Sequence, residues 1–260
     1  MAAPSTGPGI LWVTSKIVQP EHLSESTYLS WYDNEHIPEI LSVTPVTSLF
    51  RFRHVDPNAD RPYLVTCPLQ SITDASEFRK TSVKSAILPD ENGVKGGSPH
   101  DCADLELRLY ELVQKYEPNG AEATLGKTRT IVTGGFDLND EVPEQEFHDW
   151  YDKEHLEKLS KLPGYLRTTR YKLLSYRTNA DTRGVKGLPS RPQDEAAERK
   201  QPTKFHAVHE FSIDVEEMDN KAAMETIGTD WAKRIFANAT KSEYGVYKLE
   251  KSFGDGKYFH

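Results

Sequence analysis

The stretch WYDNEH at residues 31–36 returns as WYDKEH at residues 150–155, at an offset of 119 residues from position 31 to position 150. The same offset aligns the pair Arg51-Phe52 with Arg170-Tyr171. A chance match of six residues does not keep its alignment through the flanking segments, whereas an internal repeat does. The sequence therefore predicts a duplicated domain.

The length of the chain agrees with a duplication, because 260 residues suit two domains of roughly 100–150 residues each. We place the first repeat at residues 9–118 and the second at residues 124–256, with an insertion at 177–202. The insertion is long and polar, and such a segment is typical of a lid or of disorder.

Both repeats show the same order of predicted elements, β-α-β-β-α-β. Apolar, alternating or β-branched runs predict strands at residues 9–18, 49–53, 63–69, 105–116, 128–136, 165–176, 205–213 and 244–253. Helices are predicted at 24–43, 71–88, 143–162 and 216–238, with Pro38 ending or kinking the first near Ile37.

Two such repeats make an α+β protein with two ferredoxin-like sheets, each covered by helices on one face. Since each sheet must also cover its other face, we expect the two sheets to close on each other. The predicted fold is an intrachain dimeric α+β barrel, in which the repeats form a pseudo-dimer.

The charge balance restricts the partners. The net charge is −8 and no basic stripe is present, which argues against nucleic acid and against an anionic membrane surface. Cys67 and Cys102 are the only cysteines, so no disulfide framework is available. We find no signal peptide and no membrane span in the sequence, and a cytoplasmic protein is expected, either a monomeric pseudo-dimer or a homodimer.

A helical wheel places the repeated histidines, His36 and His155, in the middle of the face that packs on the sheet. Asp33 and Asp152 lie three residues before them and are expected to reach the rings. A half-buried imidazole beside a carboxylate suits general acid–base catalysis. The alternative is that each histidine is a core residue that packs the helix on the sheet. The two interpretations weigh about evenly for the second repeat, whereas for His36 the core interpretation is favoured.

The second repeat carries additional titratable groups. It has His148 where the first repeat has Leu29, and His206 and His209 where the first has Leu64 and Cys67. Only one of the two strand histidines can face the helix, and we favour His209. The predicted catalytic residues are therefore His155, Asp152, His148, Tyr151 and His209, and the predicted substrate-binding residues are His36, Tyr32, Arg170 and Trp150.

Other interpretations remain open at this stage. His148, Asp152 and His155 could form a facial metal set, or His155 could be an axial haem ligand, although the expectation is a protein without cofactor or metal. Arg51 and Arg170 could form structural ion pairs with Glu35 and Glu154, or hold a substrate carboxylate.

The segment EFHDWYDKEHLEKLSKLPGYLRTTRYKL at residues 146–173 resembles the first helix and second strand of EthD-like dimeric α+β barrel proteins. Residues 28–52 show the same pattern, so the chain resembles a tandem, fused version. The family's motif histidine corresponds to His36 and His155. The second repeat has Glu157 at the position that matches Pro38, which implies a straighter helix there.

The resemblance implies a pocket between sheet and helices, and relatives that include cofactor-free monooxygenases, polyketide cyclases, decarboxylases, isomerases and haem-binding proteins. The leading hypothesis is a cofactor-independent lyase, cyclase, decarboxylase or isomerase that acts on a small carbonyl or phenolic compound of secondary metabolism, such as a polyketide. The alternatives are a non-catalytic barrel for ligand binding or assembly, and a cofactor-free monooxygenase.

Overall fold

The computed structural model describes residues 6–191 and 200–257. The first half of the chain contains β1 (Gly9–Ile17), α1 (Glu25–Trp31), the π-helical turn η1 (Tyr32–His36), α2 (Ile37–Val43), β2 (Ser48–His54), β3 (Tyr63–Leu69), the 3-10 helix η2 (Ile72–Lys80), α3 (Pro99–Cys102) and β4 (Ala103–Tyr116). The second half contains α4 (Ala121–Thr124), β5 (Thr130–Leu138), α5 (Glu144–Trp150), the π-helical turn η3 (Tyr151–His155), α6 (Leu156–Leu159), β6 (Tyr165–Arg177), α7 (Asn179–Val185), β7 (Phe205–Phe211), the 3-10 helix η4 (Val215–Glu217), α9 (Asn220–Glu225), α10 (Asp230–Ala237) and β8 (Ala239–Gly254).

The described residues form two compact units. The first unit comprises residues 6–111, 174–191, 200–202 and 250–257, and the second comprises 112–173 and 203–249. These units differ from the sequence repeats because the long strands β4, β6 and β8 each contribute residues to both. The insertion after β6 accordingly belongs to the first unit.

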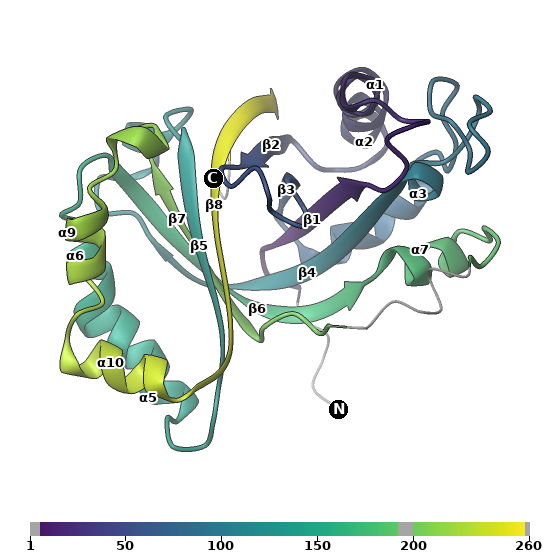
Figure 1. Ribbon diagram of the computed structural model, residues 1–260. Coiled ribbons are helices and arrows are strands. Elements are labelled where there is room, and N and C mark those ends of the chain that lie inside the picture. The colour runs from purple at the N-terminus through teal and green to yellow at the C-terminus, as the bar shows by residue number, and fades with distance from the viewer. Residues whose placement is uncertain (1–5, 192–199, 258–260) are drawn as a thin grey trace. The chain divides into compact units, whose positions relative to one another are not determined.

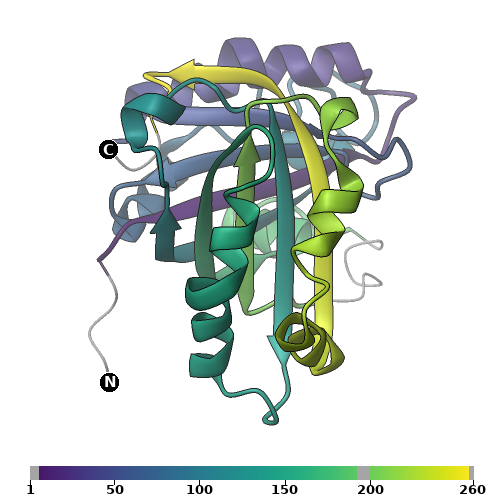
Figure 2. The ribbon, with the colours of Figure 1, turned by 90° about the vertical axis from the view of Figure 1, so that its left-hand side faces the viewer.

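The strand order confirms the predicted fold class. In the first unit the order is β8-β2-β3-β1-β4, and in the second it is β8-β5-β7-β6-β4, so the hydrogen-bonded order closes as an antiparallel barrel. Helices α1 and α2 lie along the sheet of the first unit (Figure 1), and α5, α6, α9 and α10 cover one face of the sheet of the second (Figures 1 and 2). This is the architecture of a dimeric α+β barrel.

Buried aromatic and aliphatic side chains attach these helices to their sheets. In the first unit the helix residues Tyr28, Trp31 and Ile40 belong to the same buried cluster as strand residues such as Val65. In the second unit Phe147 and Trp150 belong to a cluster with Phe205 and Ala207 of β7. No helix within residues 6–191 and 200–257 is long and apolar enough to cross a membrane.

Two predicted helices differ from the observed ones, whereas the strand predicted at 63–69 is observed with Pro68 inside it. The helix expected at 71–88 is a 3-10 helix that ends at Lys80. The helix expected at 216–238 is divided, because Asp219 and Thr229 each accept a backbone hydrogen bond that starts a new helix. Pro68 does not interrupt β3. Because β2 pairs with β3 only as far as Thr66, the side of β3 that faces β2 is a free edge at Pro68, and the backbone N–H that proline lacks is not needed there.

The repeated motif forms a π-helical turn in both halves of the chain. Pro38 is the second residue of α2, which follows the first of these turns, and the helix continues to Val43 instead of ending near Ile37. The second half has the same five-residue turn without a proline. The turn therefore comes from the shared motif, and the straighter helix expected in the second repeat is not observed.

Candidate functional site

The π-helical turns place each motif histidine on the tryptophan five residues before it. The ring centroids of Trp31 and His36 are 4.6 Å apart with an interplanar angle of 13°. Those of Trp150 and His155 are 4.4 Å apart at 15°. A π turn bonds residues five apart, so these positions lie above each other. A wheel drawn at 100° per residue misses this stacking, because it assumes an uninterrupted α-helix.

The motif aspartates do not orient the histidines, contrary to the sequence-based expectation. Asp33 accepts hydrogen bonds from Nε and Nη2 of Arg51 at 3.0 and 3.2 Å. Asp152 accepts a hydrogen bond from the side chain of Gln114. The Nδ1 atom of His155 is buried and has no hydrogen-bond partner among the described residues. The extra residue of the π turn rotates each aspartate away from the histidine that follows it.

The predicted arginine–glutamate pairs are also wrong. Arg170 donates to Gln114 Oε1 at 2.7 Å, lies 3.0 Å from His148 Nδ1, and stacks 3.7 Å above the ring of Tyr151. Glu154 instead accepts hydrogen bonds from Trp150 Nε1 at 3.2 Å and from Thr229 Oγ1 at 2.6 Å. In the first repeat Arg51 bonds Asp33 and Glu250, while Glu35 accepts from Ser85 Oγ at 2.5 Å.

Two histidines of the second repeat, His155 and His209, are packed tightly. His155 and His209 are 4% and 7% exposed and meet edge to face at 5.8 Å. His209 Nδ1 lies 2.8 Å from Thr168 Oγ1, which accepts a hydrogen bond from the hydroxyl of Tyr165. Burial lowers the pKa of His155 to about 4 and the pKa of His209 well below its ordinary value. Both rings are therefore neutral at pH 7.

The second unit leaves little space beside its candidate residues. The cavity bordered by His148, Tyr151, Arg170 and His206 has a volume of about 10 Å³, which is at the lower limit for one water molecule. His206 and His209 point to opposite faces of β7, as period two requires, and both are buried. A substrate would need this region to open.

The first unit, in contrast, contains two adjoining pockets. The inner pocket has a volume of about 90 Å³, and its polar lining includes His36, His100, Lys186, Tyr32 and Thr182. The outer pocket has a volume of about 530 Å³. Both pockets are lined by Leu11, Phe78, Val83, Leu107, Thr182 and Lys186. The inner pocket has room for the reacting end of a substrate, and the outer pocket has room for the rest of it.

His36 lies in the inner pocket with its ring stacked on Trp31. Burial, together with smaller contributions from the positive charge of Lys186 and from His100, lowers the pKa of His36 to about 3. No hydrogen bond to His36 is found within the described residues. The imidazole is thus neutral at pH 7, and its ring nitrogens are available to a ligand.

His100 is the second imidazole of the inner pocket, and it comes from the short helix α3. Its Nδ1 lies 2.7 Å from Asn179 Oδ1, while Asn179 Nδ2 donates to the His100 carbonyl oxygen at 3.1 Å. The second bond sets the orientation of the amide, so Oδ1 must accept a hydrogen bond from the protonated Nδ1 of His100. Nε2 is then the basic nitrogen of His100. Burial lowers the pKa of His100 to about 4.

The insertion after β6 holds α3 in place. Arg183 of α7 donates to Asp101 Oδ1 at 2.6 Å and to the His100 carbonyl oxygen at 2.9 Å. Arg191 donates to the carbonyl oxygens of His100 and Asp101, each at 3.0 Å. In the described part of residues 177–202, α7 is therefore a wall of both pockets. Residues 192–199, which are part of the expected lid, lie outside the described residues, and closure of the lid stays a prediction.

Sequence reasoning identified His36 and Tyr32 but missed His100, Asn179 and Lys186. Ser98 and Asp101 form a capping box, and that signature could have located α3 in the glycine-rich loop. No local signal joins α3 to Asn179, which is 79 residues away.

The facial metal set that the sequence left open as an alternative is not assembled in the second unit. Asp152 bonds Gln114, His148 contacts Arg170, and His155 stacks on Trp150. Within the described ranges, no three or more His, Cys, Asp or Glu side chains are grouped so that they could hold a metal ion.

The closed strand order and the helices outside it define a protein with the dimeric α+β barrel fold, and solved structures share that fold. One is a protein classed as a monooxygenase from Fusobacterium nucleatum subsp. nucleatum, with a TM-score of 0.53, 11% identity and coverage of 98% of this chain and 97% of that chain. Another is an anthrone oxidase-like protein, with a TM-score of 0.51, 11% identity and coverage of 99% and 97%.

A curated relative is also found by sequence. The chain is 27% identical over 206 residues to Core atranone cluster (CAC) protein 1 of Stachybotrys chlorohalonatus (strain IBT 40285), covering 78% of this chain and 82% of that protein. No protein-family profile matches the chain.

Proposed function

We propose that this protein is a cofactor-independent acid–base enzyme of the lyase, cyclase, decarboxylase or isomerase type, and that it acts on a small carbonyl or phenolic compound. The supporting observation is that two neutral imidazoles, His36 and His100, line one pocket and keep a ring nitrogen available. We propose further that the chain is a tandem EthD-like protein, on the strength of its repeated motif and its barrel.

The proposed chemistry is removal of a proton from a carbon or oxygen acid. A neutral imidazole accepts the proton, and the negative charge that develops on the substrate raises the pKa of the imidazole beside it. Lys186 lines the same pocket, and its ammonium would stabilise an enolate or phenolate oxygen. The imidazolium formed in this way then returns the proton to another atom of the substrate or to its leaving group, which completes an isomerisation, elimination or ring closure.

For the second repeat we propose a structural role. The side chains of the second repeat's candidates, namely His155, His148, His209, Tyr151 and Asp152, contact other protein side chains, and the cavity beside His148 and Tyr151 has a volume of only about 10 Å³. Their part in catalysis, expected from the sequence, would require the second unit to open. A substrate-induced opening would be visible as increased hydrogen exchange in β7 on addition of substrate.

The comparisons give the proposal a chemical context. The relative in Stachybotrys is named for a secondary-metabolite cluster, and one structural neighbour is named as anthrone oxidase-like. Anthrone is a carbon acid, and loss of one methylene proton gives its enolate. It is therefore a suitable probe. If O₂ then oxidises the enolate, one anthrone and one O₂ give one anthraquinone and one water.

The test measures deuterium incorporation into the methylene group of anthrone in D₂O by NMR. We expect the wild-type protein to accelerate exchange, and His36→Gln and His100→Gln to reduce the acceleration by about 10²-fold or more, the usual contribution of a general base. His22→Gln, at an exposed position, is the control. Equal rates in the wild type and both pocket variants would contradict the proposal. Oxygen uptake would favour the monooxygenase alternative.

A further inference from the structure

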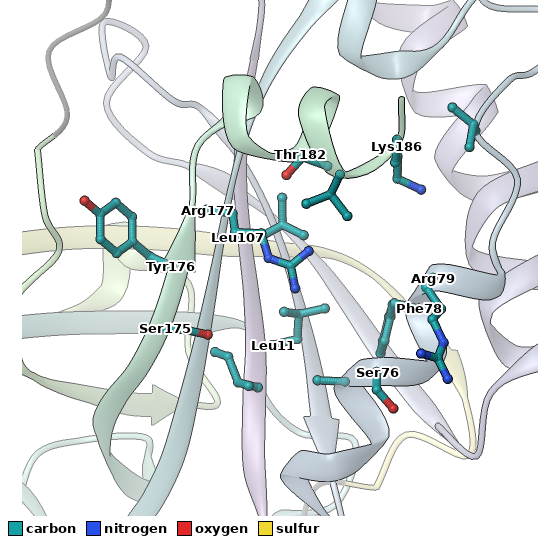
Figure 3. A pocket seen from close by; sticks show the side chains of 14 residues that line it. Leu11, Ser76, Phe78, Arg79, Leu107, Ser175, Tyr176, Arg177, Thr182 and Lys186 are labelled. Carbon is teal, nitrogen blue, oxygen red and sulfur yellow. The ribbon is translucent and has the colours of Figure 1, made fainter. Parts of the chain in front are cut away.

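The outer pocket has a cationic rim and an apolar floor. Arg79 comes from η2, Arg177 from the end of β6, and Lys186 from the residue after α7. Figure 3 shows these three side chains around the pocket, whereas Tyr176 points away from it. The floor is made of Leu11, Phe78, Leu107 and Leu109. Among the described residues, no aspartate or glutamate side chain lines this pocket.

In residues 6–191 and 200–257, no carboxylate lines the outer pocket to balance its positive rim. Within the described residues, neither Arg79 nor Arg177 forms an ion pair or a hydrogen bond with another side chain. Lys186 is half-buried. Burial lowers the pKa of Lys186, whereas the carboxylate of Glu39 raises it electrostatically, but Glu39 does not line the outer pocket. The chain as a whole carries a charge of −8, so three cations around one pocket oppose the general charge of the protein.

We propose that the outer pocket binds the carboxylate of an aromatic or polycyclic substrate, while the ring system lies on the apolar floor and reaches the inner pocket. This inference names the substrate class of the proposed enzyme and rests on that proposed function. A guanidinium presents paired N–H donors that match a planar carboxylate. A volume of about 530 Å³ lies within the range of roughly 300–1,000 Å³ found for small-molecule sites.

The pocket fits a carboxylate better than a phosphate. Phosphate sites commonly use glycine-rich backbone or the N-terminus of a helix to present several N–H groups. The described residues that line the outer pocket include no glycine, and α7 ends at the pocket instead of starting there. The donors are side chains, and two of the three are arginines.

The test compares two isosteric probes on the full-length protein. Binding of 1-naphthoate and of its neutral amide, 1-naphthamide, is measured by fluorescence titration at low and at physiological salt. We expect the naphthoate to bind about tenfold more tightly or better, because a hydrogen bond to a charged group is stronger than one to a neutral group. We expect Arg177→Gln and Arg79→Gln each to remove most of this preference. Arg129→Gln is the matched control, since Arg129 is exposed and pairs with Asp214 in the second unit.

The outcomes separate this inference from the proposed function. Equal affinity for the two probes, or a preference that survives Arg177→Gln combined with Arg79→Gln, would overturn the carboxylate assignment. Tighter binding of 1-naphthyl phosphate than of 1-naphthoate would overturn it in favour of a phosphate. His36→Gln should keep the preference for naphthoate. Retained preference in a protein that does not exchange anthrone protons would support the carboxylate site and contradict the acid–base function.

Discussion

Replacing Asn179 by aspartate tests whether the amide sets the protonation of His100. In the wild type, Asn179 Oδ1 accepts from His100 Nδ1 at 2.7 Å, and burial holds the pKa of His100 at about 4. Asn179→Asp places a negative charge at that distance. An opposite charge within ~4–6 Å changes a pKa by about 1–3, so we expect the pKa of His100 to rise towards its ordinary value of about 6.5.

The same substitution changes how stability depends on pH. A histidine whose folded pKa lies below its unfolded pKa destabilises the fold as the pH falls from about 6.5 through 4, because the unfolded chain binds the proton first. Asn179→Asp brings the two pKa values closer and weakens that loss. At neutral pH it should cost about 1–3 kcal/mol, since the new carboxylate faces the His100 carbonyl oxygen to which Asn179 donated.

The measurement is an NMR titration of the imidazole Cε1–H of His100, together with urea unfolding at pH 7.5 and pH 5.5. Asn179→Ala is the control, because it removes the same hydrogen bond without adding a charge. The stability gap between wild type and Asn179→Asp should narrow at the lower pH. An identical titration of His100 in the aspartate and alanine variants would refute the assignment of the Nδ1–H tautomer.

Two further predictions concern the second unit. Burial depresses the pKa of His155 and His209. The free energy of unfolding should therefore stay level above about pH 6.5 and fall below that pH, by up to about 1.4 kcal/mol per pH unit for each histidine. Urea unfolding at several pH values would measure this, and the same dependence of stability on pH in His155→Gln as in the wild type would contradict it. Arg167→Met should cost about 3–5 kcal/mol, because Glu210 is fully buried and accepts from Arg167 at 2.7 and 2.9 Å. Adding Glu210→Gln should recover much of that loss in thermal unfolding, and a single-variant loss below about 1 kcal/mol would contradict the estimate.

The fold could be predicted because its signals are local and repeated. Alternation at period two marked β2 and β4, and the duplicated WYD-x-EH motif marked the helix of each repeat. The need of each half-covered sheet for a partner then indicated a barrel. These features depend on the periodicity of side chains along one segment, which is visible in the sequence.

The candidate site could not be predicted in the same way. The π-helical turns add one residue to a helical turn, and this places His36 on Trp31 and moves Asp33 to Arg51. A helical wheel drawn at 100° per residue does not include this extra residue. The greater number of histidines in the second repeat favoured that repeat as the location of the catalytic site, whereas the larger of the described pockets lie in the first unit.

By itself, the sequence determined the repeated motif, the barrel fold class and the approximate positions of the strands, because hydrophobic periodicity and a repeated motif are properties of neighbouring residues. Only the tertiary structure decided where space is left beside an imidazole. His100 acquires its tautomer from Asn179, 79 residues away, and the pocket wall that carries Lys186 comes from an insertion in the other repeat. Free volume and long-range hydrogen bonds arise from how segments pack, and no local pattern encodes them.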